Sequence, residues 1–148
     1  MLILLPPSEG KTRPETGPAL DLTKLSSPEL NPVRQQLMNA LVKLSGSKNG
    51  AEVLGLGPKL HGELEHNRNL PHAPTARADE IYTGVLFGEL DPASLDPAAR
   101  ARLDQRVAIA SALFGLVRPS DLIPAYRLSG SVTLPRLGTV SSRWKPVM

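Results

Sequence analysis

Prolines are spread along the whole chain, and they limit the length of any helix or strand that it can form. Fifteen prolines and twelve glycines occur among the 148 residues. Proline lacks a backbone donor and breaks helix interiors and central strands, so we expect short elements joined by many loops. A hydrophobic content of 41% is enough for a packed core and excludes wholesale disorder. The length then favours a single globular domain over residues 1–148.

Missing residue types exclude several classes of function. The chain has no cysteine, which rules out disulfides, cysteine-bound zinc, iron–sulfur clusters and thiol catalysis. His61, His66 and His72 lie in one polar stretch without metal-ligand spacing, so we predict no metal site and no cofactor. The apolar run 2–5 is far shorter than the roughly 20 residues of a membrane helix, and no basic residue precedes it as in a secretory signal. We therefore expect a cytoplasmic protein that does not contact membranes.

The clearest helix signal starts at residue 31. Asn31-Pro32 combines a capping residue with a proline suited to the first helical turn. Gly46 is placed to end this helix. Between them, apolar side chains follow at helical spacing, at Val33, Leu37, Leu41 and Leu44.

Further elements are predicted by the same reasoning. Asp96-Pro97 repeats the cap-and-proline signal and predicts a helix over residues 97–106. Shorter helices are expected after Gly57-Pro58 and from a cap at Thr75 to Tyr82. The stretch before Pro32 is predicted as an extended crossover with at most one helical turn.

Two apolar runs predict the strands of a central sheet. Residues 1–5 read as a short buried strand that Pro6-Pro7 stops. Residues 107–113 combine small and branched apolar side chains, which is typical of a buried central strand. A loop over residues 114–121 and a strand over 131–134 follow. These elements predict a mixed α/β (α+β) fold, with a central sheet, flanking helices and a helix-hairpin-helix-like element.

Lys11 follows the first strand in a Gly10-Lys11-Thr12 sequence that invites comparison with a phosphate-binding loop. The full pattern needs a glycine where Leu5 stands, so the loop cannot wrap a triphosphate in the usual way. Lys11 then either meets a single anion or is an exposed lysine without a role.

The helix-hairpin-helix-like element lies around Gly55 and Gly57. An apolar residue, glycine, apolar residue, glycine pattern precedes the expected helix start at Pro58. The two glycines permit a tight hairpin, and N–H groups at the next helix start would face a DNA phosphate. Lys59 adds a positive charge. The alternative is an ordinary turn between two helices.

A third set of candidate residues follows the predicted central strand. Arg118 and Arg127 are placed to clamp an anion, with Asp121 orienting one guanidinium and Tyr126 stacking or donating a hydrogen bond. The alternative is a structural arginine–aspartate pair that holds a long loop. Residues 118–148 also carry an excess of basic side chains, namely Arg118, Arg127, Arg136, Arg143 and Lys145 against Asp121 alone.

Taken together, three separated motifs resemble the YaaA family of bacterial peroxide-stress proteins. They are residues 2–12, residues 82–86, and residues 111–121 continued by 126–128; Trp144 fits the same pattern. Members of that family continue beyond this point. The chain therefore looks like the N-terminal portion of a longer fold, and an exposed sheet edge or apolar face would then favour self-association.

The resemblance implies a positively charged cleft, DNA binding, and protection against peroxide by limiting damage from free iron, with no established reaction. It places the hairpin at Gly55, Gly57 and Lys59, and the cleft at Lys11, Arg118, Asp121, Tyr126 and Arg127. DNA is thus the expected partner.

Two alternative functions remain beside DNA binding. An enzyme for a small anionic or nucleotide-like substrate would need Lys11, Arg118, Asp121, Tyr126 and Arg127 to converge in one pocket, with Asp121 close to a ligand atom. Direct iron binding is disfavoured, because the chain lacks thiols and a clear cluster of histidines and carboxylates.

Overall fold

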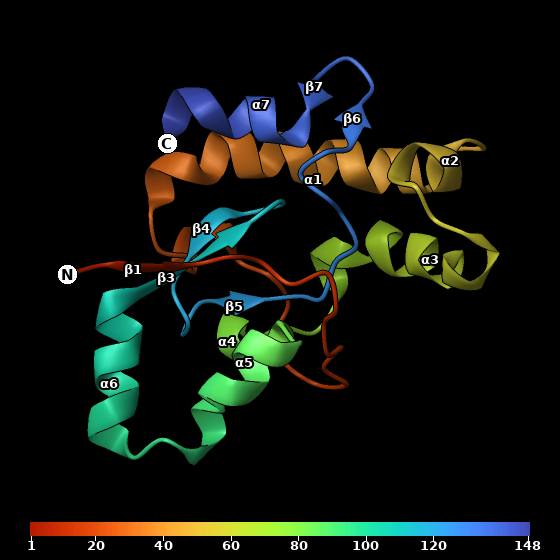
Figure 1. Cartoon of the computed structure of the whole chain (residues 1–148). Coiled ribbons are helices and arrows are strands. Elements are labelled where there is room, and N and C mark those ends of the chain that lie inside the picture. Colours follow the sequence, from red (N-terminus) through yellow and green to blue (C-terminus); the bar gives the residue numbers. More distant parts are fainter.

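A three-stranded sheet lies at the centre of the computed structural model, which describes all 148 residues (Figure 1). Strand β3 (Val107–Ser111) is the middle strand; it pairs in parallel with β1 (Ile3–Leu5) and antiparallel with β4 (Gly115–Val117). The side chains of β3 are almost all buried. The buried central strand predicted from residue 107 is therefore confirmed, although it ends at Ser111. The mixed α/β class is confirmed as well.

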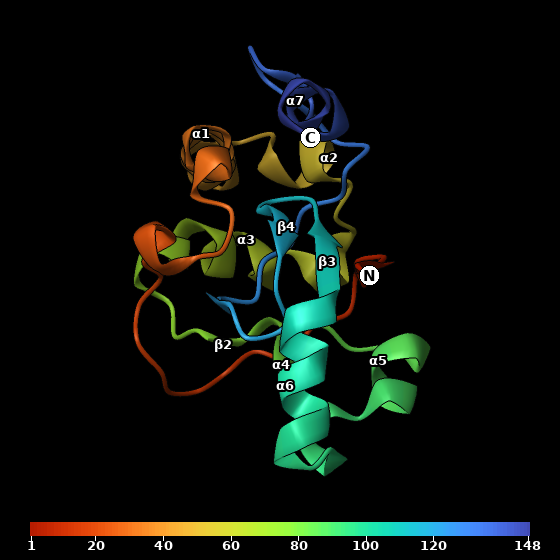
Figure 2. The same cartoon turned by 90° about the vertical axis from the view of Figure 1, so that its left-hand side faces the viewer.

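Helices lie on two sides of this sheet. In the views of Figures 1 and 2, α1 (Asn31–Ser45) and α7 (Val140–Trp144) lie on one side. On the other side lie α4 (Ala78–Ile81), α5 (Val85–Leu90) and α6 (Pro97–Arg106). The remaining helices are α2 (Gly50–Leu54), α3 (Gly62–Arg68) and the 3-10 turns at Leu22–Lys24, Pro28–Leu30, Pro58–Leu60, Leu70–His72, Pro92–Ser94 and Lys145–Val147. No helix is both long enough and apolar enough to cross a membrane.

Two small antiparallel pairs complete the secondary structure. Strand β2 (Ala76–Arg77) pairs with β5 (Leu122–Ile123), and β6 (Thr133–Leu134) pairs with β7 (Gly138–Thr139). The strand predicted over 131–134 is therefore present as the shorter β6. The pair formed by β2 and β5 positions the start of the segment that leads to Tyr126 and Arg127.

The predicted stripe of α1 is confirmed and forms much of the core. Val33, Leu37, Leu41 and Leu44 are all buried in one hydrophobic cluster, and the helix ends at Gly46. Asn31 is not the cap that the sequence predicted. Two 3-10 turns precede the helix in place of the single turn expected, and the side chain of Asn31 donates to the Leu22 carbonyl and accepts from Arg34.

Helix α6 has the predicted bounds, because its cap is local. The Asp96 carboxylate accepts a hydrogen bond from the Ala99 N–H at 2.7 Å, and Pro97 occupies the first helical position. The cap predicted at Thr75 is wrong. Its hydroxyl donates to the Pro18 carbonyl at 2.8 Å, and β2 separates it from α4.

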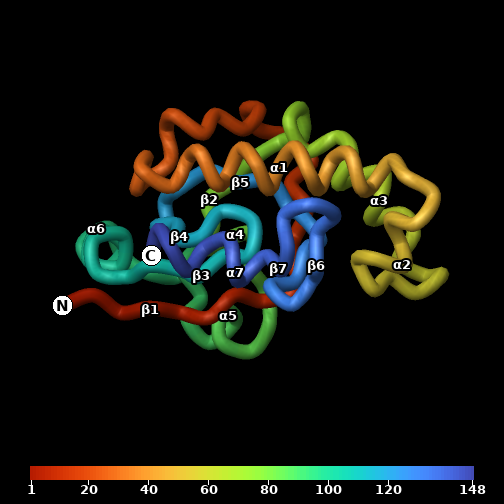
Figure 3. Tube along the Cα trace, turned by 90° about the horizontal axis from the view of Figure 1, so that it is seen from above, coloured from red at the N-terminus to blue at the C-terminus, as the bar shows by residue number.

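The first strand is present but is not buried, which corrects the sequence prediction. Leu2, Ile3 and Leu4 are exposed by 57%, 43% and 59%. Strand β1 pairs only with β3, and Figure 3 shows it running along one margin of the molecule, away from α1. An apolar run predicts a strand, whereas its burial depends on an element that covers it. An exposed edge of this kind leaves N–H and C=O groups open for pairing.

Strand β4 lies inside the stretch that the sequence predicted as a loop. Gly115 starts it with a φ of +78°, which favours glycine, and a β-carbon at this position would lie 2.8 Å from the Trp144 ring. Such a short strand has too few residues to show a periodic pattern. Helices α5 and α7 were missed for the same reason.

Candidate anion-binding site

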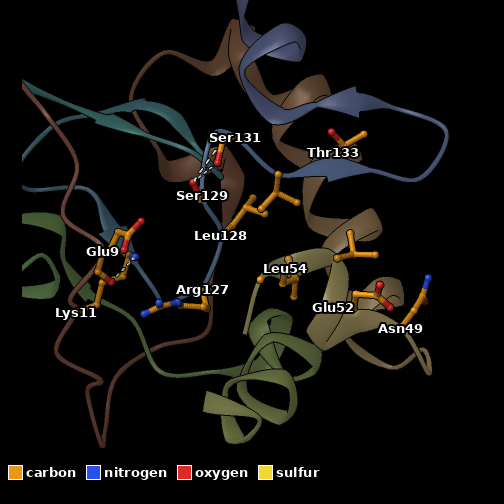
Figure 4. Close-up of a pocket in the computed structure, with 13 residues that line it drawn as sticks. Glu9, Lys11, Asn49, Glu52, Leu54, Arg127, Leu128, Ser129, Ser131 and Thr133 are labelled. Atoms are coloured by element: carbon orange, nitrogen blue, oxygen red, sulfur yellow. Dashed lines mark hydrogen bonds between the residues drawn. The ribbon is translucent and has the colours of Figure 1, made fainter. Parts of the chain in front are cut away.

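A cavity of about 790 Å³ lies between three stretches that are far apart in the sequence. The first contributes Glu9 and Lys11, the second belongs to α2 and the residues beside it, and the third follows Tyr126 (Figure 4). The lining residues are Glu9, Lys11, Asn49, Glu52, Val53, Leu54, Gly55, Arg127, Leu128, Ser129, Ser131, Val132 and Thr133. The distant stretches predicted to meet at Lys11 and Arg127 therefore do meet.

Lys11 is positioned by backbone pairing. It forms an isolated antiparallel bridge with Tyr82, and the flanking Thr12 N–H donates to the Ile81 carbonyl at 2.7 Å. The Lys11 ammonium donates to the Glu9 carbonyl at 3.2 Å and lies 4.3 Å from the centre of the Tyr126 ring. The half-buried cation is thus held by a ring face and one carbonyl, without a carboxylate partner.

The site lowers the pKa of Lys11. Burial is the main cause, and the nearby Arg127 guanidinium adds to it; Glu9 and Glu63 oppose the shift. The pKa falls from its ordinary value of 10.5 to about 8. At neutral pH the amine is therefore still mostly protonated, but it releases its proton far more readily than an exposed lysine does.

Arg127 is held by its backbone and leaves its guanidinium free. The fully buried Asn67 amide accepts from the Arg127 N–H at 3.0 Å and donates to the Arg127 carbonyl at 2.9 Å. The guanidinium forms no hydrogen bond or ion pair with the protein, and Figure 4 shows it extending toward Lys11. Asn67 was missed in the sequence, where a lone asparagine in a polar helix gives no signal.

Three buried hydroxyl groups form a hydrogen-bonded cluster that holds the Tyr126 ring against Lys11. The Tyr126 hydroxyl lies 2.8 Å from that of Tyr82 and 2.8 Å from that of Ser111, which in turn accepts from the Phe114 N–H at 3.1 Å. Burial raises the pKa of both tyrosines, so they stay neutral. The Tyr126 ring therefore presents a rigid, uncharged face to the ammonium.

Arg118 and Asp121 do not line this cavity, so the predicted convergence of five residues is wrong. The Arg118 guanidinium donates to the carbonyls of Gln105 and Val107, at the end of α6. Asp121 accepts from the Arg118 backbone N–H at 2.8 Å and from Ser26. Both side chains hold the loop that contains them, as in the structural alternative, although the aspartate binds the backbone of Arg118 and not its guanidinium.

The glycine turn borders the cavity at one point. Gly55 lines it and has a φ of +71° at the end of α2. Gly57 is extended, and a 3-10 turn with the exposed Lys59 follows before α3 begins. Gly57 and Lys59 do not line the cavity. The helix-hairpin-helix character of this turn stays a prediction.

Arg34 is a buried cation that the sequence analysis overlooked. Its guanidinium donates to the carbonyls of Phe114, Leu116 and Ser27 and to the side chain of Asn31, with the bond to Leu116 at 2.7 Å. Burial lowers its pKa, and Asp121 and Glu29 oppose this effect. The available signal in the sequence was a charged residue beside the apolar stripe of α1. Arg34 holds β4 in place through its hydrogen bonds to the carbonyls of Phe114 and Leu116.

These features define a small mixed α/β protein in which an N-terminal Ser-Glu-Gly-Lys loop and an arginine from a distant loop form one polar cavity. Over residues 1–148, the sequence matches the family described as peroxide stress protein YaaA. The chain belongs to this family.

Curated relatives support the assignment. The chain is 45% identical to a UPF0246 protein of Streptomyces coelicolor. The match extends over 150 residues and covers all of this chain and 58% of the relative. It is 47% identical over 148 residues to a UPF0246 protein of Corynebacterium efficiens, covering 97% of this chain and 58% of the relative. An uncharacterized protein of Campylobacter jejuni is 30% identical over 131 residues, covering 86% of this chain and 52% of the relative. The chain thus spans a little over half the length of these relatives.

Proposed function

We propose that this protein acts in the peroxide stress response by binding the phosphate backbone of DNA at the Lys11–Arg127 end of the cavity. The observation that carries the proposal is the pairing of two cations that have no carboxylate partner. Lys11 and Arg127 come from opposite ends of the chain, and the Arg127 guanidinium repels the Lys11 ammonium, which adds to the effect of burial in lowering the pKa of Lys11. A phosphate between them would relieve this repulsion and accept hydrogen bonds from both.

The cavity also contains acidic side chains, and their position matters for this proposal. Glu52 lies with Asn49 at the end of the cavity away from Lys11 and Arg127 in Figure 4. Glu9 is exposed, and its backbone carbonyl, not its carboxylate, receives the bond from Lys11. The cationic end is thus available to an anion, while Gly55 and the neighbouring Gly57 and Lys59 would extend the backbone contact.

A salt titration with a fluorescent DNA duplex tests this proposal. Each phosphate contact contributes a slope of about 0.9 in log affinity against log salt. Arg127→Gln should therefore reduce the slope by about 0.9 and weaken binding equally for different DNA sequences. Arg102→Gln on α6 makes the same charge change at an exposed position that does not line the cavity, and should leave the slope nearly unchanged. Absence of binding at 50 mM salt would refute the proposal.

We also propose that this binding limits damage to DNA from free iron and peroxide in the bacterial cytoplasm. A protein that covers the backbone can shield it from radicals formed nearby without binding iron itself. Nicking of a plasmid by ferrous iron and hydrogen peroxide should decrease when the protein is added, and Arg127→Gln should protect less than Arg102→Gln. Equal protection by all three proteins would contradict a role for the site.

An enzyme that acts on a small anionic substrate is the second candidate. The cavity volume of about 790 Å³ favours it, because a surface that only contacts a DNA backbone does not need a cavity of this size. Asp121 and Arg118 take no part in this version, since they lie elsewhere.

A further inference from the structure

We propose that Lys11 is a nucleophilic amine that forms an imine with an aldehyde, and that Arg127 holds a phosphate carried by the same molecule. This inference rests on the phosphate binding proposed above and adds a covalent step at the same site. The substrate class is a sugar aldehyde beside a phosphate.

Lys11 differs in its surroundings from every other lysine of the chain. Lys24, Lys43, Lys48, Lys59 and Lys145 are all exposed, whereas Lys11 is half-buried. Its ammonium rests against the face of Tyr126 and lines a cavity large enough for a sugar phosphate. An amine that is fixed by its backbone, open to a cavity and free of ion pairs meets the geometric needs of a nucleophile.

The charges that face the amine favour its reactive form. Arg127 and burial weaken its hold on the proton, Glu9 and Glu63 strengthen it less, and the two neighbouring tyrosines are neutral. A pKa of about 8 leaves roughly three-hundredfold more neutral amine at pH 7 than the ordinary lysine value does. Desolvation beside another cation is a known way of activating a lysine for reaction with carbonyl groups.

The chemical step balances with the groups that are present. The neutral Lys11 nitrogen attacks the carbonyl carbon, a C–N bond forms as the C=O π bond breaks, and one proton moves from the nitrogen to the oxygen to give a neutral carbinolamine. With a proton from solvent, the hydroxyl leaves as water as the C–O bond breaks and the nitrogen lone pair forms the C=N bond. The nitrogen then releases its remaining proton to solvent, which leaves the imine. No electrons are gained or lost overall.

The lining of the cavity indicates what the aldehyde would be attached to. Arg127 supplies a forked donor for a phosphate, and Ser129, Ser131 and Thr133 supply hydroxyls for a sugar. This chemistry has two sources, a free sugar phosphate and the open-chain sugar of an abasic site in DNA. Both place an aldehyde a few bonds from a phosphate.

Reductive trapping on the full chain tests the inference. Sodium cyanoborohydride supplies hydride that converts the imine into a stable secondary amine, and peptide mapping by mass spectrometry locates it. The probes are glyceraldehyde 3-phosphate in one arm and a duplex with one abasic site in the other. We expect the adduct at Lys11 in at least one arm. The arm that labels Lys11 identifies the source.

The variants separate chemistry from binding. Lys11→Arg keeps the charge but removes the amine, and should decrease adduct formation at least tenfold, while Lys43→Arg changes an exposed lysine and should not. Trapping by the unmodified chain should increase with pH and level off near pH 8, and not near 10.5, as expected from the lowered pKa. Labelling spread evenly over Met1 and the exposed lysines in both arms would overturn the inference.

The same proteins distinguish this inference from the proposed function. If undamaged duplex binds with the expected salt dependence but Lys11 is not trapped, only the covalent step fails. If Lys11 is trapped by the sugar phosphate but no duplex binds, DNA binding fails and the reactive amine remains.

Discussion

Arg118 and Arg127 lie at the two ends of one segment and are used in opposite ways. The Arg118 guanidinium is bound by backbone carbonyls of Gln105 and Val107. Arg127 is bound through its backbone by the Asn67 amide, and its guanidinium is free to face the cavity. The difference lies in which part of the residue forms hydrogen bonds with the protein. The Arg118 guanidinium holds the fold, whereas the Arg127 guanidinium is available for the phosphate contact proposed above.

Arg34 and Lys11 extend this comparison to the rest of the molecule. Arg34 is buried with partners for its guanidinium from three carbonyls and one side chain, whereas Lys11 is half-buried with a single carbonyl partner. Buried polar groups are almost always satisfied in stable folds. A cation that lines a cavity with few hydrogen-bond partners therefore supports the proposal that an anionic ligand binds there.

The largest effect on stability is expected at Arg34. Arg34→Met keeps the volume but leaves the carbonyls of Phe114 and Leu116 without their donor, so the free energy of unfolding should fall by about 3–5 kcal/mol. Chemical denaturation measures this change. Arg102→Met, at an exposed position of α6, should stay within about 0.5 kcal/mol. A similarly small effect at Arg34 would mean that its guanidinium is not structural.

Substitution of Lys11 should have the opposite effect to substitution of Arg34, because it should raise the free energy of unfolding at neutral pH. Its pKa is about 8 in the folded chain and 10.5 when unperturbed, so between these values the unfolded chain holds a proton that the folded chain has released. The free energy of unfolding therefore rises with pH across this window, relative to a variant without the amine.

Lys11→Met isolates that contribution. It should be more stable than the unmodified chain by up to about 2 kcal/mol at pH 7, after loss of the contact with Tyr126, and this advantage should disappear toward pH 10.5. Denaturation midpoints from pH 7 to 10 check it. A constant difference between the two proteins would contradict the lowered pKa.

The elements that could be predicted from the sequence are those that depend on interactions between neighbouring residues. The cap at Asp96 and the stripe from Val33 to Leu44 depend on neighbours a few residues away, and both elements formed as predicted. The burial of β1 and the existence of β4 depend on distant partners, and both predictions failed. The first strand lies at the edge of the sheet and is exposed. Strand β4 requires a glycine at position 115, because the Trp144 ring leaves no room for a β-carbon, and its neighbouring carbonyls accept hydrogen bonds from Arg34.

The candidate site follows the same rule. Lys11, Tyr126 and Arg127 could be singled out by residue type. In the structure Lys11 and Arg127 line one cavity, and the buried ring of Tyr126 lies against the Lys11 ammonium. The sequence left open whether Arg118 and Asp121 bind an anion or hold their own loop, because a guanidinium has the same sequence signature whether a carbonyl or a phosphate binds it. Asn67 acts through two hydrogen bonds to the backbone of Arg127, and Ser111 acts through one to the Tyr126 hydroxyl. No local sequence pattern reveals such distant contacts.

Asp121 holds the same loop as Arg118, and its substitution should destabilise the protein less than that of Arg34. Both of its oxygens accept hydrogen bonds, one from Ser26 and the other from the Arg118 N–H. Asp121→Asn turns one acceptor into a donor that faces another donor, so unfolding should become easier by about 1–3 kcal/mol. Asp91→Asn, at an exposed position, is the matched control. Thermal melting compares the two, and equal melting temperatures would show that the loop does not depend on this carboxylate.

Arg118 and Arg127 can be compared directly, because their substitution should affect different properties. Arg118→Gln removes bonds to two carbonyls and should lower the free energy of unfolding by about 1 kcal/mol, with the salt dependence of DNA binding unchanged. Arg127→Gln should change stability by less than about 0.5 kcal/mol and reduce the salt slope by about 0.9. Measuring both quantities on both variants makes each the control for the other. If Arg118→Gln reduced the slope as much as Arg127→Gln does, carbonyl satisfaction would not distinguish structural from binding arginines in this fold.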